Sequence, residues 1–227
     1  MSCLLFLFTE VGENVTTIVT IVAIVLLCAL LVTAILLTLK RAISTREIVF
    51  AGICLASSFV LSYIKFAPVT YGGSITLASF VPIIIYSFYF GFSRGIIAGF
   101  IYGVLQFVQS PYILTPATFL LDYLLPFAMI CLAPLARKIK VKEHWQLVLG
   151  TLFTYAGRFL MHFLSGVIFF EMGAVWAELP ANTSVMYSLL YQVVYLVPDA
   201  IICAIALFVL SKTGVINKIL PKQKAGN

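Results

Sequence analysis

Four ionisable residues stand inside long apolar segments of this chain: Asp122, Arg158, His162 and Asp199. A charged residue at the centre of a membrane helix costs about 2.5–3.5 kcal/mol on insertion scales, so such residues are functional candidates by default. With a rise of about 1.5 Å per residue, Asp122, His162 and Gln192 lie about 10–13 Å from the ends of their segments on one side of the membrane. Three polar side chains at one level, on three helices, indicate a small-molecule pocket between helices.

The remaining two charged residues, Arg158 and Asp199, lie deeper, about 20 and 22 Å from the same ends. We interpret them as a structural ion pair between the last two apolar segments, because a buried charge without a partner is strongly destabilising. The sequence therefore predicts two levels, a polar pocket and a charged pair beneath it.

Aromatic residues surround the level of the pocket. They are Tyr123, Phe169, Phe170, Tyr187, Tyr191 and Tyr195. A carboxylate among aromatic rings suits a cationic, aromatic ligand, through charge pairing and cation–π contact. Each feature also has a structural interpretation, because aromatic residues near helix ends form interfacial belts and a histidine inside a membrane often makes a packing hydrogen bond.

The composition sets the class of protein that must position these residues. Of 227 residues, 63% are hydrophobic and 10% are charged, and the mean hydropathy is +1.13. Soluble domains are about 45–50% apolar and about 25% charged, so a soluble enzyme and a disordered chain are both excluded. The alternating ten-residue strands of an outer-membrane barrel are absent from the sequence. We therefore predict an all-α integral membrane protein.

Seven apolar runs are long enough to be membrane segments. They are Val15–Leu39, Ile48–Ile64, Ile75–Phe90, Ile96–Val108, Ala117–Leu135, Leu147–Phe170 and Val185–Leu210. The first is too long for the apolar core of a signal peptide, which has about 7–15 residues, and acidic residues precede it. It is therefore predicted to be a transmembrane helix.

The basic residues are concentrated in alternate loops, on one side of the predicted membrane. All 14 lysines and arginines except Lys65 and Arg158 lie between segments one and two, three and four, five and six, or after segment seven. The other loops hold Lys65, Glu171 and Glu178. The positive-inside rule then predicts a cytoplasmic C-terminus and an N-terminus outside, and it explains the net charge of +6 by membrane orientation rather than by nucleic-acid binding.

Motifs of catalysis are missing from the sequence. There is no GxxxxGK[ST] phosphate loop, no HExxH and no GxSxG, and the five cysteines have no metal-binding spacing. We therefore expect no enzyme, no metal and no cofactor. Transport by this chain would draw its energy from partner proteins or from an ion gradient.

Small residues mark two helix faces. Gly91, Gly95, Gly99 and Gly103 recur every four residues and are predicted to pack inside the protein, because small residues let helices approach closely in lipid. Gly52 and Ala56 form a second pair on the first segment after the basic Lys40–Arg46 stretch. We predict that they form a docking face for another membrane protein, with internal packing as the alternative.

Several sequence blocks resemble the thiamine-binding S component of energy-coupling factor (ECF) transporters of bacterial cell membranes. They span about residues 46–211 and read YGGSITLASFVPIIIYSF, GIIAGFIYGVLQF, YILTPATFLLDYLLPFA, HFLSGVIFF and YSLLYQVVYLVP. The resemblance implies a six-helix protein that captures thiamine from outside and works with a transmembrane coupling subunit and two ATPase subunits, which use the ATP. It also implies that the helix carrying Gly52 and Ala56 docks on the coupling subunit.

The resemblance also assigns residues to the site. Family ligand-binding positions fall on Asp122, Tyr123, His162, Phe170, Tyr187 and Gln192. This chain differs where some members have a glutamate, a tryptophan or an asparagine, at Asp122, Phe170 and Gln192, and it has Gly73 where some carry a tryptophan that covers the ligand.

The chain thus divides into an N-terminal tail with an extra transmembrane helix (1–45), a six-helix substrate-binding domain (46–211) and a basic cytoplasmic tail (212–227). Two alternatives stay open at this point. The same scaffold would serve a thiamine precursor or another vitamin, or the chain would act alone as an ion-coupled secondary transporter that uses Asp122 or Asp199.

Overall fold

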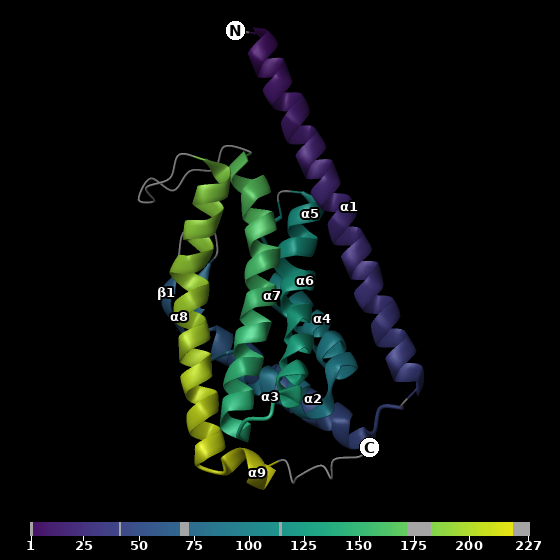
Figure 1. The fold of residues 1–227 in the computed structure, drawn as a ribbon, viewed down its shortest axis with the longest axis vertical. Coiled ribbons are helices and arrows are strands. Elements are labelled where there is room, and N and C mark those ends of the chain that lie inside the picture. Colours follow the sequence, from purple (N-terminus) through teal and green to yellow (C-terminus); the bar gives the residue numbers. More distant parts are fainter. Residues whose placement is uncertain (1, 41, 69–72, 114, 172–182, 220–227) are drawn as a thin grey trace.

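The computed structural model describes residues 2–40, 42–68, 73–113, 115–171 and 183–219. A long N-terminal helix, α1 (Ser2–Lys40), leans against a bundle and its first turns extend beyond the rest of the molecule (Figure 1). Glu178 and the end of the predicted basic tail, 220–227, lie outside the described residues.

The bundle is made of the helices that follow α1. In chain order they are α2 (Thr45–Ser62), α3 (Val81–Phe90), α4 (Phe92–Gln109), a fifth span over residues 116–138, α7 (Glu143–Glu171), α8 (Ser184–Lys212) and the short α9 (Val215–Ile219). In the part of the chain that the structure describes, five helical spans are long and apolar enough to cross a membrane: α1, α2, the fifth span, α7 and α8. The last four of these, with α3 and α4, make the six-helix core. The predicted all-α membrane fold, six helices plus one, is confirmed.

The third predicted segment was wrong at its start. Ile75 belongs to strand β2 (Ser74–Thr76), which pairs antiparallel with β1 (Lys65–Pro68), so these residues form a hairpin and not a helix. Helix α3 begins only at Val81 and has 10 residues, about 15 Å at the usual helical rise, or half the thickness of a membrane. An apolar run cannot distinguish a buried strand from the start of a helix.

The fifth span also differs from the single helix that the sequence predicted over Ala117–Leu135. It changes from α5 (Pro116–Phe119) through a π-helical turn, η2 (Leu120–Leu124), and α6 (Leu125–Ala128) to a 3₁₀ segment, η3 (Met129–Lys138). Prolines lack the N–H that an α-helical ladder requires, and the span holds Pro126 and Pro134. Because π-helical turns are frequent at functional sites, the position of Asp122 inside η2 is notable.

Glycines let α4 approach the fifth span. A Cβ atom added at Gly95, Gly99 or Gly103 would collide with the backbone of that span. The prediction of internal packing is therefore confirmed for these three. Gly91 has another role, because it forms the turn between α3 and α4 with φ of 100°, a conformation that favours glycine.

A buried ion pair joins α2 and α4. Arg94 Nε lies 3.1 Å from Glu47 Oε2, and both side chains are 4% exposed. The sequence placed Arg94 in the loop between segments three and four, whereas it lies buried in the first turn of α4. The difference has a physical reason: Arg94 follows Gly91 within the first turn of α4, and the helix turns it inward against α2.

Candidate ligand-binding site

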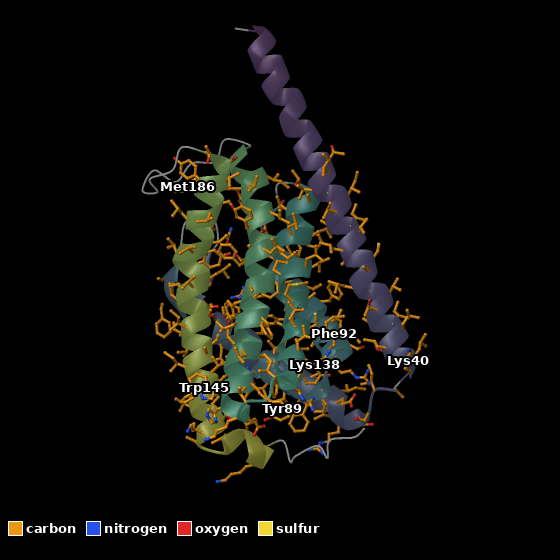
Figure 2. The ribbon with its side chains drawn as sticks, in the orientation of Figure 1. Lys40, Tyr89, Phe92, Lys138, Trp145 and Met186 are labelled. Atoms are coloured by element: carbon orange, nitrogen blue, oxygen red, sulfur yellow. The ribbon has the colours of Figure 1, made fainter. Side chains whose placement is uncertain are left out.

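A cavity of about 170 Å³ lies between the hairpin, α4, the fifth span, α7 and α8. Its polar and charged lining includes Ser62, Lys65, Thr76, Gln106, Gln109, Asp122, Arg158, His162, Ser165, Gln192 and Asp199. The connecting segments contribute Lys65 and residues within 73–76 and 109–112 to the cavity, and these segments do not carry the basic clusters. Figure 2 places Lys40, Lys138 and Trp145 toward the end of the molecule opposite Met186.

Asp122 is the acidic group that the cavity leaves most accessible. Its side chain is 34% exposed, whereas that of His162 beside it is 10% exposed. Ser165 Oγ donates a hydrogen bond of 2.7 Å to Asp122 Oδ2, and His162 Nδ1 lies 3.3 Å from Oδ1. The carboxylate is thus held from α7 while part of it remains open to a ligand.

Helix α8 completes the polar group. Gln192 Nε2 donates a hydrogen bond of 3.0 Å to the backbone oxygen of His162. Four buried polar atoms of cavity-lining side chains have no hydrogen-bond partner among the described residues: Gln192 Oε1, His162 Nε2, and Nε and Nη1 of Arg158. The structure therefore brings together Asp122, His162 and Gln192, which the sequence placed at one level.

Aromatic rings form one wall of the cavity. Phe170 and Tyr191 meet with ring centroids 6.0 Å apart, and Tyr191 meets Tyr195 at 5.4 Å. Tyr187, which the resemblance assigned to the site, stacks on Phe170 at 5.4 Å. Phe170, Tyr191 and Tyr195 line the cavity, so Tyr187 supports that wall from behind Phe170.

Tyr123 lines the cavity and fixes a loop. Its hydroxyl donates a hydrogen bond of 2.6 Å to the backbone oxygen of Ser110 and accepts one of 3.0 Å from the backbone N–H of Tyr112. Its ring also meets Phe107 and Phe119, at centroid distances of 5.1 and 6.0 Å. The hydroxyl therefore holds the loop after α4 in place.

The predicted pair of Arg158 and Asp199 is close but is not the main contact of either side chain. Arg158 Nη1 lies 3.8 Å from Asp199 Oδ2, beyond hydrogen-bond distance, and the guanidinium lies 3.8 Å from the ring centroid of Phe80. Asp199 accepts hydrogen bonds from the N–H and hydroxyl of Thr76, both 3.0 Å, and from the Tyr155 hydroxyl at 2.5 Å. Both charged residues line the cavity, and Asp199 ties the hairpin to α8.

Sequence reasoning did not identify the hairpin or Ser165 as parts of the site. Ser165 stands three residues after His162, a spacing that puts both on one helix face, so this signal was available. Gly73 donates its N–H to the Tyr191 hydroxyl at 3.0 Å, and a Cβ atom there would lie 2.8 Å from that oxygen. Contacts of this kind join residues 118 positions apart and leave no local sequence pattern.

Two other predictions concern metals and docking. Among the described residues, no group of three or more His, Cys, Asp or Glu side chains could hold a metal ion. Gly52 and Ala56 lie on an exposed face of α2, and a Cβ atom added at Gly52 would meet nothing within 4 Å. The face that they share is free of intramolecular packing at Gly52.

Comparison with known proteins agrees with this architecture. Residues 48–218 match the model of the family described as thiamine transporter protein (Thia_YuaJ). The thiamine transporter ThiT of Bacillus subtilis (strain 168) is 32% identical over 191 residues, which cover 77% of this chain and 93% of that protein. A solved structure of ThiT from Listeria monocytogenes shares the fold, with a TM-score of 0.61 at 21% identity over 74% of this chain and 94% of that one. The chain belongs to the thiamine transporter protein family, a family of transporters and not of enzymes.

Proposed function

We propose that this protein is the substrate-capture subunit of a vitamin importer and that it binds thiamine in the cavity described above. The observation that carries the proposal is the partly accessible carboxylate of Asp122, held by Ser165 and His162 beside the aromatic wall of Phe170 and Tyr191. Thiamine combines a permanently cationic thiazolium ring with an aminopyrimidine ring. A carboxylate and aromatic faces are the groups that attract such a cation.

The polar atoms without partners support the same ligand. Gln192 Oε1 is an acceptor and suits an exocyclic amine, while His162 Nε2 is a donor or an acceptor, depending on the tautomer. A buried polar group without a hydrogen bond is costly, so a ligand that supplies the missing bonds gains affinity. The aminopyrimidine ring offers both a donor amine and acceptor ring nitrogens.

A ligand panel tests the substrate. The purified protein in detergent is titrated with thiamine, with its separate pyrimidine and thiazole halves, and with unrelated vitamins such as riboflavin and biotin. We expect thiamine to bind most tightly, because only the whole molecule uses the carboxylate, the aromatic wall and the free polar atoms together. Tighter binding of one half, or of another vitamin, would overturn the assignment of thiamine.

Energy coupling is the second part of the proposal. The sequence has no phosphate loop, so we infer that a transmembrane coupling subunit and two ATPase subunits of an ECF module supply the energy. The exposed face of α2 with Gly52 and Ala56 is the proposed docking surface, because small residues allow close approach of helices in lipid. Uptake by cells with and without the ATPase subunits separates this proposal from a stand-alone ion-coupled transporter.

The proposed orientation follows from charge. The ends of the helices that carry the basic clusters would face the cytoplasm, which places the C-terminus inside and the cavity loops outside. Labelling of a single cysteine introduced at Tyr112, in a cavity loop, by a membrane-impermeant reagent on intact cells tests this orientation. The opposite result, in which a cysteine introduced at Lys140 is labelled on intact cells and one at Tyr112 is not, would show the reverse orientation.

A further inference from the structure

Helix α1 lies outside the segment that matches the family, residues 48–218, yet it is packed onto the ligand-binding domain. It runs beside α4 and the α5 end of the fifth span (Figure 1) and contacts both, as well as η2 and α7. Most of its described side chains are exposed, as expected for a helix that faces lipid on its other sides. Its few buried residues therefore identify where it packs against the domain.

Ala23 is the most deeply buried residue of α1 among those whose side chains are described, with 0% of its surface exposed. It belongs to a hydrophobic cluster whose other buried members are Ala117, Leu121, Leu125, Met161 and Ile168. These residues come from the fifth span and from α7. Because alanine is small, α1 approaches both elements at this point.

The cluster lies directly behind the proposed site. Leu121 precedes Asp122 in the π-helical turn, and Met161 precedes His162 in α7. Leu121 and Met161 belong to the cluster that contains Ala23, whereas Asp122 and His162 line the cavity, so one member of each pair faces α1 while the next faces the cavity. The contact between Asp122 and His162 therefore lies next to an apolar layer that α1 completes.

A second contact of α1 lies near its C-terminal end, away from the site. Ala34 packs with Ile96 and Cys131, and Ser93 Oγ donates a hydrogen bond of 3.1 Å to its backbone oxygen. Ala34 is 11 residues from Ala23, about 16 Å along the helix. The two alanines are thus a matched pair, one behind the site and one remote from it.

We infer that α1 is a positioning element of the binding site: through Ala23 it sets the spacing between the turn that carries Asp122 and the helix that carries His162. This inference rests on the proposed function, because its consequence for activity is thiamine affinity. Protein interiors are close-packed, so a shift of the apolar layer would also shift the polar side chains that line the cavity next to it. The geometry of Asp122, His162 and Ser165 should then depend on a helix that never enters the cavity.

The test compares Ala23→Leu with Ala34→Leu in the full-length protein. Both substitutions add the same volume to a buried contact of α1, so both should lower the thermal stability. We expect only Ala23→Leu to lower thiamine affinity, by about tenfold, because it would distort the charge-assisted hydrogen bond between the Asp122 carboxylate and the ligand. Combining it with Leu121→Ala makes room in the cluster for the added leucine side chain and should recover part of the affinity.

Two further readouts separate positioning from general damage. In an Asp122→Asn background, Ala23→Leu should have little additional effect on affinity, because the group through which it acts is already altered. The chain has two histidines, so ¹⁵N-histidine NMR reports on the site without ligand. Ala23→Leu should shift the ring signals of His162 and leave those of His144, and Ala34→Leu should shift neither.

Equal effects of the two leucine substitutions on affinity and on the His162 signals would overturn the inference. Ala23→Val replaces Ala23→Leu in the same comparison if the larger side chain prevents folding. A wild-type protein that does not bind thiamine would overturn the proposed function alone, because the His162 signals still decide whether α1 positions the site.

Discussion

Ser165 and Asp122 are joined by a hydrogen bond of 2.7 Å across 43 residues of sequence. The bond links α7 to a π-helical turn, so the acidic group of the site is fixed by an element other than its own. A carboxylate held in this way keeps one orientation before a ligand arrives, and preorganisation lowers the cost of binding. The site is therefore built by packing between spans rather than by any single helix.

The hairpin anchor at Asp199 gives the first prediction. Asp199→Ala removes the acceptor of the hydrogen bonds from Thr76 and Tyr155 and leaves the buried charge of Arg158 without its nearby carboxylate, so it should destabilise the protein by about 3–5 kcal/mol. Arg158→Met should cost less, because Asp199 keeps its hydrogen bonds from Thr76 and Tyr155. Unfolding in detergent measures both, and an equal or larger loss for Arg158→Met would show that the ion pair dominates.

The second prediction concerns Gly73. A Cβ atom there meets the Tyr191 hydroxyl at 2.8 Å, so Gly73→Ala should displace the hairpin and cost about 1–3 kcal/mol of overpacking. We expect faster release of thiamine, measured by a chase with unlabelled ligand. Adding Tyr191→Phe removes the oxygen that obstructs the methyl group but also the acceptor of the Gly73 N–H, so it should slow release only in part. Unchanged release from Gly73→Ala would mean that the hairpin does not cover the ligand.

The third prediction concerns the buried pair of Glu47 and Arg94. Arg94→Ala leaves the carboxylate of Glu47 buried opposite an apolar group, so a loss of about 3–5 kcal/mol in stability is expected. Arg46→Ala, in the exposed first turn of α2, is the control and should change stability by no more than about 0.5 kcal/mol. Similar losses for the two variants would show that burial of the pair contributes little.

The fourth prediction tests the proposed docking face. Gly52→Trp and Ala56→Trp add bulk to the exposed face of α2 and should abolish uptake in cells that contain the ATPase subunits, while purified protein still binds thiamine. Ile201→Trp is the control, because Ile201 is 54% exposed on α8, outside that face. Normal uptake by the α2 variants, or loss of uptake by the control as well, would rule out a dedicated docking face on α2.

The sequence predicted the shared level of three polar side chains better than the backbone that carries them. Depth along a helix follows from the rise per residue, so Asp122, His162 and Gln192 could be placed at one level by counting. The π-helical turn around Asp122 could not be predicted, because hydrophobic periodicity does not separate one wide turn from an α-helix. The hairpin was missed because its residues are fixed by Asp199 and Tyr191, which are distant in sequence.

The central claim, that the carboxylate of Asp122 receives a cationic ligand, is tested most directly by titrating Asp122→Asn with thiamine beside the wild-type protein. The substitution removes the charge and keeps the shape, so it should lose about 1.5–3 kcal/mol, or about 10- to 150-fold in Kd. Asp122→Glu restores the charge and should bind more tightly than Asp122→Asn. A thiamine affinity of Asp122→Asn equal to that of the wild type would contradict the account.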